Sequence, residues 1–267
     1  MFPSPQKHLG QNFLIDRRVA RRIIEACALD REDVVLEIGP GRGALTGMIA
    51  ERVKRVIAIE KDRALAQALY EEFKDTNTTV IEADILQFPL EQLPPSLKVI
   101  GNLPYNIATA IIQKFLKCHR RFRVFYMGVQ REHADRMTAA VHSKIYGAFS
   151  LFVQYYSEVK KLFPIKNTAF YPVPKVQSFF VKMRPHPKPL LSVVDEKALF
   201  DLIHAAFSQR RKMIVNTLSQ VFIKEDLKKL CEGIHLNPQA RAEDVTLAEY
   251  IQLTQYLKES KSSHSSL

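Results

Sequence analysis

The most chemically informative stretch of the chain is Asn102-Leu-Pro-Tyr105, which combines an amide, a proline and an aromatic ring. The amino nitrogen of an adenine or a glutamine is a poor nucleophile because its lone pair is delocalised. The side-chain oxygen of Asn102 and the carbonyl of Leu103 could accept its two hydrogens, since Pro104 has no N–H and holds Leu103 extended. Tyr105 could stack on the same flat group. The pattern indicates chemistry on an exocyclic amine, although a proline turn that starts a helix has similar composition.

Three glycines at alternate positions, Gly39, Gly41 and Gly43, lie between an apolar run and a helical pattern. A strand, a glycine turn and a helix form nucleotide sites in open α/β sheets, because glycine lets the backbone approach a ligand closely. The spacing is GxGxG, whereas a dinucleotide loop has GxGxxG. Glu37, at the end of the apolar run, could meet a cationic ligand. We interpret the loop as a site for S-adenosylmethionine, whose amino and sulfonium groups are cationic; the alternative is a tight strand–helix turn.

Acidic or amide side chains also follow the next predicted strands. Glu60 lies 21 residues after Gly39, the spacing of an acid that accepts hydrogen bonds from ribose hydroxyls. Asp84 follows the third strand and could accept from the adenine amino group of the cofactor, and Asn102 follows the fourth. Each could instead cap the next helix or turn. Because the carboxyl ends of parallel strands meet at one sheet edge, three such residues favour a shared crevice.

The elements that must position these residues alternate between strand and helix, which predicts a parallel sheet. We expect strands at 34–38, 55–60, 79–81, 97–100, 123–129, 158–163 and 176–183, the last two as an antiparallel pair. We expect helices at 17–28, 44–52, 62–73, 107–116, 131–141, 196–207, 211–221, 224–232 and 247–258. Asp16 could cap the first of these helices, and Thr246 with Glu249 has the spacing of a capping box for the last. The predicted fold is α/β, a Rossmann-like methyltransferase sheet followed by a small all-α C-terminal domain.

Composition divides the chain into unequal parts. Residues 1–184 carry the motifs above and form the predicted catalytic, cofactor-binding domain. Residues 185–190 contain three prolines and read as an extended linker. Residues 191–260 show helical patterns only and form a predicted small helical domain, and the polar residues 261–267 should be a disordered tail.

The net charge of the chain is +11, from 39 basic and 28 acidic residues. Up to Met183 there are 27 basic and 18 acidic residues, so the excess lies with the catalytic motifs. This distribution suggests a polyanionic partner, most simply a nucleic acid, with solubility as the alternative. The candidate phosphate contacts are Arg17, Arg18, Arg21, Arg22, Arg120, Arg121, Arg123, Lys160, Lys161 and residues 210–212.

The three cysteines, Cys27, Cys118 and Cys231, are scattered and form no CxxC pair. This pattern argues against a disulfide framework or a zinc site, and we expect buried thiols in a reducing compartment and no metal. The N-terminus lacks the apolar region of a signal peptide, and no apolar run approaches the length of a membrane span. These features predict a cytoplasmic protein.

The whole set of motifs resembles the rRNA adenine N6,N6-dimethyltransferase family, and within it the type that acts on the small subunit. The resemblance spans nearly the full chain, and the combination is specific although no single piece is. The chain departs from the family pattern at Gln177, where an acidic residue is expected. The motifs are residues 7–14 (KHLGQNFL), 37–46 (EIGPGRGALT), Glu60, Asp84, 102–105 (NLPY), 170–176 (FYPVPKV), 207–212 (FSQRRK) and 241–247 (RAEDVTL).

The resemblance implies roles for individual residues. Gln11, Asn12 and Leu14 would close over the cofactor. Gly39 and Gly41 would lie under its methionine part, Glu60 would hold the ribose, and Asp84 with Ile85 would hold the adenine. Lys61 would also belong to the cofactor-binding residues. Where the cofactor meets the target base, Asn102, Leu103 and Tyr105 would bind the amine. Tyr105 would stack on one face of the base and Phe170 on the other.

The resemblance also implies the reaction, the partner, and a role in rRNA recognition for the helical domain of residues 191–260. S-adenosylmethionine would donate methyl groups to N6 of two adjacent adenines in a 3′-terminal hairpin of 16S rRNA, within an immature 30S subunit, and the chain would act as a monomer away from membranes. One alternative is a 23S rRNA methyltransferase of the antibiotic-resistance type. Others are a non-catalytic ribosome-assembly factor and a nicotinamide oxidoreductase, the last disfavoured by the GxGxG spacing.

Overall fold

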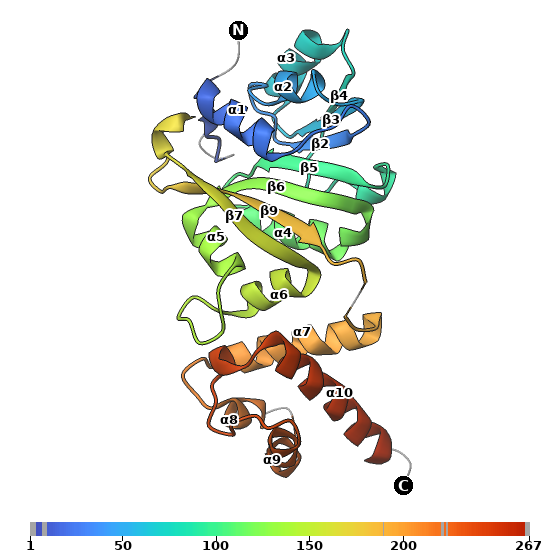
Figure 1. Cartoon of the computed structure of the whole chain (residues 1–267), viewed down its shortest axis with the longest axis vertical. Coiled ribbons are helices and arrows are strands. Elements are labelled where there is room, and N and C mark those ends of the chain that lie inside the picture. Colours follow the sequence, from blue (N-terminus) through green and yellow to red (C-terminus); the bar gives the residue numbers. More distant parts are fainter. Residues whose placement is uncertain (1–3, 7–9, 189, 220–221, 223, 265–267) are drawn as a thin grey trace. The chain divides into compact units, whose positions relative to one another are not determined.

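The computed structural model describes residues 4–6, 10–188, 190–219, 222 and 224–264. The chain divides into two compact units, one formed by residues 1–134 with 156–187 and the other by residues 135–155 with 188–267. Figure 1 shows the first unit built around a sheet and the second built from helices. The second unit includes residues 135–155, which the sequence grouped with the catalytic motifs, and the separate roles of the two parts stay a prediction.

The first unit contains a seven-stranded sheet with the strand order β4-β3-β2-β5-β6-β9-β7 (Figure 1). The five strands from β4 to β6 are parallel, and β9 pairs antiparallel with both β6 and β7. This arrangement confirms the predicted fold class. In chain order the strands are β2 (Val34–Ile38), β3 (Arg55–Glu60), β4 (Thr78–Glu82), β5 (Leu97–Asn102), β6 (Phe122–Gln130), β7 (Ser157–Ile165) and β9 (Ser178–Pro185).

The order of the strands creates a topological switch point between β2 and β5. The chain runs outward from β2 through β3 to β4 and then returns to build β5 on the other side of β2. Ligands of open α/β sheets bind in the crevice at the carboxyl ends of strands that diverge in this way. The glycine loop follows β2 and Asn102 ends β5, so both predicted motifs lie at this crevice.

Helices cover both faces of the sheet because the strands are apolar on both sides, as parallel strands usually are. The helices α1 (Arg17–Ala26) and α2 (Thr46–Ala50) contribute Ile23 and Ile49 to a core that includes Val35 and Val56. On another part of the sheet, Phe115 of α4 (Ala108–Lys117) packs on aromatic rings of β6. The remaining helices of this unit are α3 (Arg63–Phe73), η2 (Leu90–Gln92), η3 (His119–Arg121) and η4 (Asn167–Ala169), with α5 (Arg131–Met137) at its boundary.

A second, two-stranded sheet was not predicted. It pairs β1 (Phe13–Leu14) antiparallel with β8 (Phe170–Tyr171), so that Phe13 lies opposite Tyr171 and Leu14 opposite Phe170. The N–H groups of Ile15 and Asp16 also donate to the carbonyl of Ala169, at 2.8 and 3.3 Å. The N-terminal segment is therefore fixed along the residues that follow β7.

The second unit is helical. Helices were predicted for its residues after 190, whereas the helix at Ala148–Tyr156 was not predicted. Tyr250 packs on Phe207, with ring centroids 6.4 Å apart, and Thr246 and Glu249 exchange the hydrogen bonds of the expected capping box. The last helix reaches His264 and so enters the segment predicted as a disordered tail, while residues 265–267 lie outside the described part. The helices are α6 (Ala148–Tyr156), α7 (Val193–Phe207), α8 (Ile214–Leu218), α9 (Lys224–Gly233), η5 (Ala242–Asp244) and α10 (Leu247–His264).

Among the described residues, no helix is both long and apolar enough to span a membrane. The three cysteines are free thiols. Cys27 and Cys231 are buried as expected, whereas Cys118 is partly exposed.

Candidate active site

The glycine loop has the backbone that only glycine adopts without strain. Gly39 and Gly41 have φ angles of 64° and 59°, in the left-handed region. The N–H of Gly39 donates to the carbonyl of Ile59 at 2.9 Å, which fixes the loop on the end of β3. A Cβ on Gly41 would lie 2.9 Å from Cδ1 of Phe13, so the missing side chain also makes room for the N-terminal segment.

Glu60 ties the loop to the next helix. Its carboxylate accepts from the N–H of Gly41 at 3.1 Å and from the N–H of Asp62 at 2.9 Å. The side chain is buried, and this burial raises the pKa of Glu60 although the two backbone donors oppose the rise. Because a carboxylate has about four acceptor positions, Glu60 can still accept from a ligand hydroxyl.

Glu37 is a buried acid of the crevice. It is 2 % exposed, lines the pocket, and its Oε2 has no hydrogen-bond partner among the described residues. Burial raises the pKa of Glu37 to about 7; the side-chain hydroxyl of Thr46 opposes the rise, and the charge of Glu60 adds to it. Buried carboxylate oxygens normally have partners, so one that has none and lies in a pocket suits a cationic group of a ligand.

Asp84 is held by its neighbours at the end of β4. Its Oδ2 lies 2.9 Å from Nζ of Lys61, and its Oδ1 accepts from the N–H of Leu86 at 2.9 Å. Partial burial raises the pKa of Asp84, but the hydrogen bonds from Lys61 and Leu86 outweigh it and leave the pKa below its usual value. The carboxylate is thus ionised and faces the pocket together with Lys61 and Ile85.

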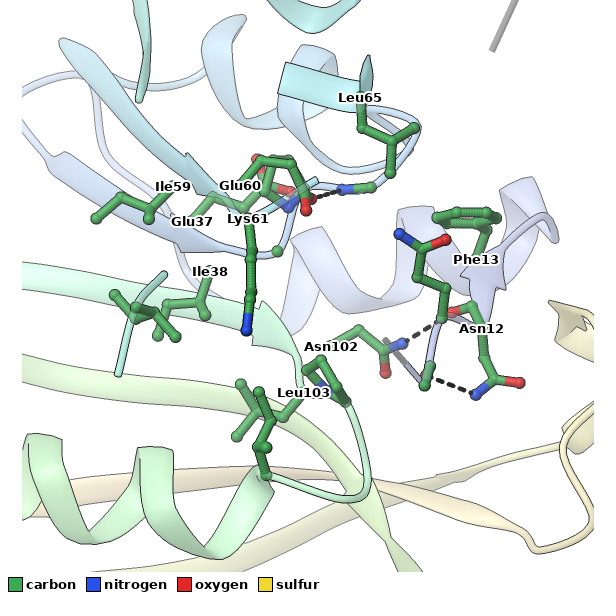
Figure 2. A pocket seen from close by; sticks show the side chains of 18 of the residues that line it. Asn12, Phe13, Glu37, Ile38, Ile59, Glu60, Lys61, Leu65, Asn102 and Leu103 are labelled. Carbon is green, nitrogen blue, oxygen red and sulfur yellow. Dashed lines mark hydrogen bonds between the residues drawn. The ribbon is translucent and has the colours of Figure 1, made fainter. Parts of the chain in front are cut away.

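The Asn102 side chain is turned toward the N-terminal segment, and its Nδ2 donates to the carbonyl of Asn12 at 3.4 Å (Figure 2). Its Oδ1 is buried and has no partner. A Cβ on Gly128, the residue beside it on β6, would overlap this oxygen, and the carbonyl of Gly128 accepts from the N–H of Leu103 at 3.0 Å. Gly128 therefore leaves space for an amide oxygen that no residue in the described part of the chain satisfies.

Tyr105 completes the turn. Its hydroxyl lies 2.7 Å from Oγ of Ser178, the fully buried first residue of β9. Burial raises the pKa of Tyr105, although the hydrogen bond to Ser178 opposes the rise, so the phenol is neutral at physiological pH. The hydrogen bond fixes the ring at the rim of the pocket.

The N-terminal segment from Gly10 to Leu14 forms one wall of the pocket. Gln11 donates from Nε2 to Oδ2 of Asp62 at 2.9 Å, and Asn12 donates from Nδ2 to the carbonyl of Gly10 at 3.1 Å. The ring of Phe13 lies 4.7 Å from the guanidinium carbon of Arg42 in the glycine loop. Part of the preceding motif, residues 7–9, lies outside the described residues.

These elements line one pocket, which opens to solvent (Figure 2). The structure brings together twelve of the predicted residues there: Gln11, Asn12, Leu14, Gly39, Gly41, Glu60, Lys61, Asp84, Ile85, Asn102, Leu103 and Tyr105. Two of its lining residues, Glu37 and Asn102, each have a buried oxygen, Oε2 and Oδ1, that lacks a hydrogen-bond partner among the described residues. A carboxylate for an ammonium group, acids at two strand ends and an amide acceptor fit S-adenosylmethionine beside an amine.

The structure does not bring Phe170 to this pocket. Phe170 is 1 % exposed and belongs to the core with Leu14 and Phe180, because its pairing with Leu14 turns the ring inward. Its neighbour Tyr171 is 52 % exposed. Stacking of a base on Phe170 stays a prediction, and it requires the ring to leave this core.

Several candidate phosphate contacts have partners within the protein. Arg123 pairs with Asp33 at 3.2 Å, Arg121 donates to two backbone carbonyls, and Arg210 pairs with Glu243 at 2.6 Å. The arginines of α1, at positions 17, 18, 21 and 22, have exposed side chains, and that of Arg22 lies 4.0 Å from the ring centre of Phe163. The exposed α1 side chains remain the best placed for a polyanion.

Sequence reasoning missed three residues that support the site: Asp62, Gly128 and Ser178. Asp62 was assigned only to the start of a helix, although its position two residues after Glu60 signals a place near the crevice. Gly128 is a glycine inside an apolar strand, which often marks a close approach of another group. Ser178 carried no signal, because its role depends on contact with Tyr105, 73 residues away.

The chain is similar to known proteins over most of its length. A family model described as "Ribosomal RNA adenine dimethylase" matches residues 4–259. The chain is 38 % identical over 259 residues to "Ribosomal RNA small subunit methyltransferase A" of Nitrosospira multiformis, covering 97 % of this chain and 98 % of that one. It is 41 % identical over 255 residues to the protein of the same name from Halothermothrix orenii, covering 91 % and 85 %.

Two solved structures of similar proteins share the fold of this chain. A dimethyladenosine transferase from Plasmodium falciparum has a TM-score of 0.77 and 25 % identity, covering 92 % of this chain and 98 % of that one. The 23S rRNA methyltransferase ErmE has a TM-score of 0.74 and 26 % identity, covering 92 % and 100 %.

Proposed function

Because the chain belongs to the ribosomal RNA adenine dimethylase family, we propose that it methylates N6 of two adjacent adenines in the 3′-terminal hairpin of 16S rRNA. Membership makes the chain a methyltransferase and bears out the resemblance found in its motifs, and the family implies S-adenosylmethionine as the methyl donor. The relatives at 38–41 % identity are named for the small ribosomal subunit, which supports 16S over 23S rRNA as the substrate. The proposal includes a monomer acting in the cytoplasm on an immature 30S subunit.

The observation that carries the proposal is the unpartnered Oδ1 of Asn102 in the pocket. A buried amide oxygen without a hydrogen bond costs free energy, so the site is arranged for a donor that arrives with a ligand. An exocyclic amine offers two hydrogens. Asn102 Oδ1 would accept one and the carbonyl of Leu103 the other, which turns the nitrogen lone pair away from both.

S-adenosylmethionine would supply a methyl group that its sulfonium already activates. Glu37 would face the amino group of the methionine part, Glu60 the ribose hydroxyls, and Asp84 the adenine. The chain would then contribute mainly by orientation, which can supply about 7–11 kcal/mol in favourable cases. The proton released from the alkylated amine would leave to solvent, since no general base is required once the amine carries the new methyl group.

Asn102 provides the test. Asn102→Ala should abolish methyl transfer and leave the affinity for S-adenosylmethionine within a few-fold, because the substitution removes the acceptor for the amine. Asn102→Asp keeps an acceptor and should retain measurable transfer. The assay is incorporation of labelled methyl groups into 30S subunits, read against cofactor titration of the same variants.

Two results would end the assignment. One is full transfer by Asn102→Ala, which would place amine recognition elsewhere. The other is labelling of 23S rRNA instead of 16S rRNA, which would favour the activity named for ErmE. A pre-rRNA assembly role is separated by asking whether Asn102→Ala still restores ribosome maturation in cells that lack the protein.

A further inference from the structure

Asp62 lies at the point where the cofactor side of the pocket meets the N-terminal segment. It is 4 % exposed and lies outside the pocket lining, two residues after Glu60. Its Oδ1 caps α3 by accepting from the N–H groups of Ala64 and Leu65, at 3.0 and 3.3 Å. This half of the carboxylate has the ordinary role of an N-cap residue.

The other half of the carboxylate has a different role. Oδ2 accepts from Nε2 of Gln11 and from Nε2 of Gln6, both at 2.9 Å. The Oε1 of Gln11 accepts in turn from the N–H of Gln6 at 2.7 Å, so both ends of the Gln11 amide are satisfied. A helix cap needs one acceptor oxygen, and the second is therefore available to hold two side chains that come from more than 50 residues away in sequence.

These contacts continue into the pocket. The N–H of Asp62 donates to Glu60, and Glu60 also accepts from the N–H of Gly41. Gln11 is followed by Asn12, Phe13 and Leu14, which wall the pocket. One chain of hydrogen bonds therefore joins the N-terminal wall to the glycine loop on the cofactor side.

We propose that Asp62 is a positioning residue whose Oδ2 fastens residues 10–14 across the cofactor, so that wall closure and cofactor binding reinforce each other. The inference rests on the proposed function in one respect, that S-adenosylmethionine is the ligand of this pocket. The competing explanation is that Asp62 only caps α3, and the two roles use different oxygens.

The separation of the two oxygens defines the variants. Asp62→Asn keeps Oδ1 for the cap but presents an amide donor to the donors of Gln6 and Gln11, which breaks the fastening. Combining Asp62→Asn with Gln11→Glu exchanges donor and acceptor and should restore the contact. Asp16→Asn is the matched control, because Asp16 caps α1 through its Oδ1 in the same way.

The full-length variants are compared by calorimetric titration with S-adenosylmethionine, by thermal unfolding and by amide hydrogen exchange of residues 10–16. We expect Asp62→Asn to weaken cofactor affinity about tenfold, equivalent to about 1.4 kcal/mol, the scale of one lost hydrogen bond to a charged group. It should speed exchange in residues 10–16 and change the unfolding temperature little. The double variant should recover most of the affinity, and Asp16→Asn should match the wild type.

Affinity and exchange of Asp62→Asn equal to those of the wild type would overturn the inference. So would a loss of affinity that follows a lowered unfolding temperature and that Gln11→Glu does not recover, because this is the behaviour of a cap alone. A wild-type chain that binds no S-adenosylmethionine would instead refute the proposed function, and hydrogen exchange would still decide whether Asp62 holds the segment.

Discussion

Ser178→Ala tests whether β9 positions the aromatic ring that meets the target amine. Ser178 is fully buried, and its Oγ lies 2.7 Å from the hydroxyl of Tyr105. Burial raises the pKa of Tyr105, so the neutral phenol needs a hydrogen-bond partner rather than a counter-ion. Alanine removes that partner and leaves a partly buried hydroxyl unsatisfied.

The magnitude follows from the asymmetry of hydrogen-bond energetics. Leaving one buried partner unsatisfied costs about 1–3 kcal/mol, whereas removing both partners can be nearly neutral. We therefore expect Ser178→Ala to lower the free energy of unfolding by about 1–3 kcal/mol. If about 1 kcal/mol of this loss also weakens the orientation of the target amine in the transition state, kcat/KM for rRNA falls about fivefold. This follows because a change of about 1.36 kcal/mol in activation free energy changes the rate tenfold.

The assay is a double-mutant cycle with Tyr105→Phe, which keeps the ring and removes the hydroxyl. Each variant is measured by methyl transfer to 30S subunits, chemical unfolding and cofactor affinity, and the last should not change. Ser150→Ala is the control, because Ser150 is equally buried and only accepts from the N–H of Gly147 at 3.2 Å. It should leave methyl transfer unaltered.

The reasoning is refuted if the losses of methyl transfer caused by Ser178→Ala and by Tyr105→Phe are additive. In the Tyr105→Phe background, Ser178→Ala should cost nothing further in transfer and should regain stability, because the serine hydroxyl left without a partner is removed. Equal losses from Ser178→Ala with and without the tyrosine hydroxyl would show that Ser178 acts on the sheet and not on Tyr105.

Three further predictions concern the cofactor and the RNA. Because burial raises the pKa of Glu37 to about 7, cofactor affinity should rise as pH increases through 7, and Glu37→Gln should flatten the profile. Gly41→Ala should destabilise the fold by about 1–2 kcal/mol, the cost of a left-handed alanine, and weaken cofactor binding, whereas Gly47→Ala in α2 should do neither. Replacing Arg17 and Arg21 by glutamine should weaken rRNA binding at low salt and reduce its salt dependence by about one to two released ions.

The sign of the Glu37 effect on stability is opposite to its effect on binding. Between about pH 4.5 and 7 the folded chain keeps a proton on Glu37 that the unfolded chain has lost, so this group makes stability fall as pH rises through that window. A cation in the pocket stabilises the ionised form of Glu37 and so offsets the free-energy cost of ionising this group in the folded chain. Cofactor affinity that is constant from pH 6 to pH 8, measured at fixed ionic strength, would show that Glu37 does not face the cationic group.

Local sequence patterns predicted the elements that depend on local physics. The five apolar runs of the parallel strands, the cap of α1 by Asp16 and the capping box of Thr246 and Glu249 all appear in the structure. So does the meeting of Glu60, Asp84 and Asn102 at one pocket, because the carboxyl ends of parallel strands necessarily share an edge.

Contacts between distant segments escaped prediction. Two residues are too few to show a strand period, so the β1–β8 pair had no signal, and the burial of Phe170 depends on its partner Leu14. Arg210 pairs with Glu243, 33 residues away in sequence, because the partner of a surface arginine is set by the fold around it. The space beside Asn102 likewise depends on Gly128 of the neighbouring strand.

The two-residue ladder between β1 and β8 restricts how the entrance of the pocket can move. Successive side chains of a strand point to opposite faces, so a slip of one residue would bring Leu14 and Phe170 out of the core together. Sliding is therefore costly, so the N-terminal wall and the segment that carries the exposed ring of Tyr171 should keep a single register while the pocket is used.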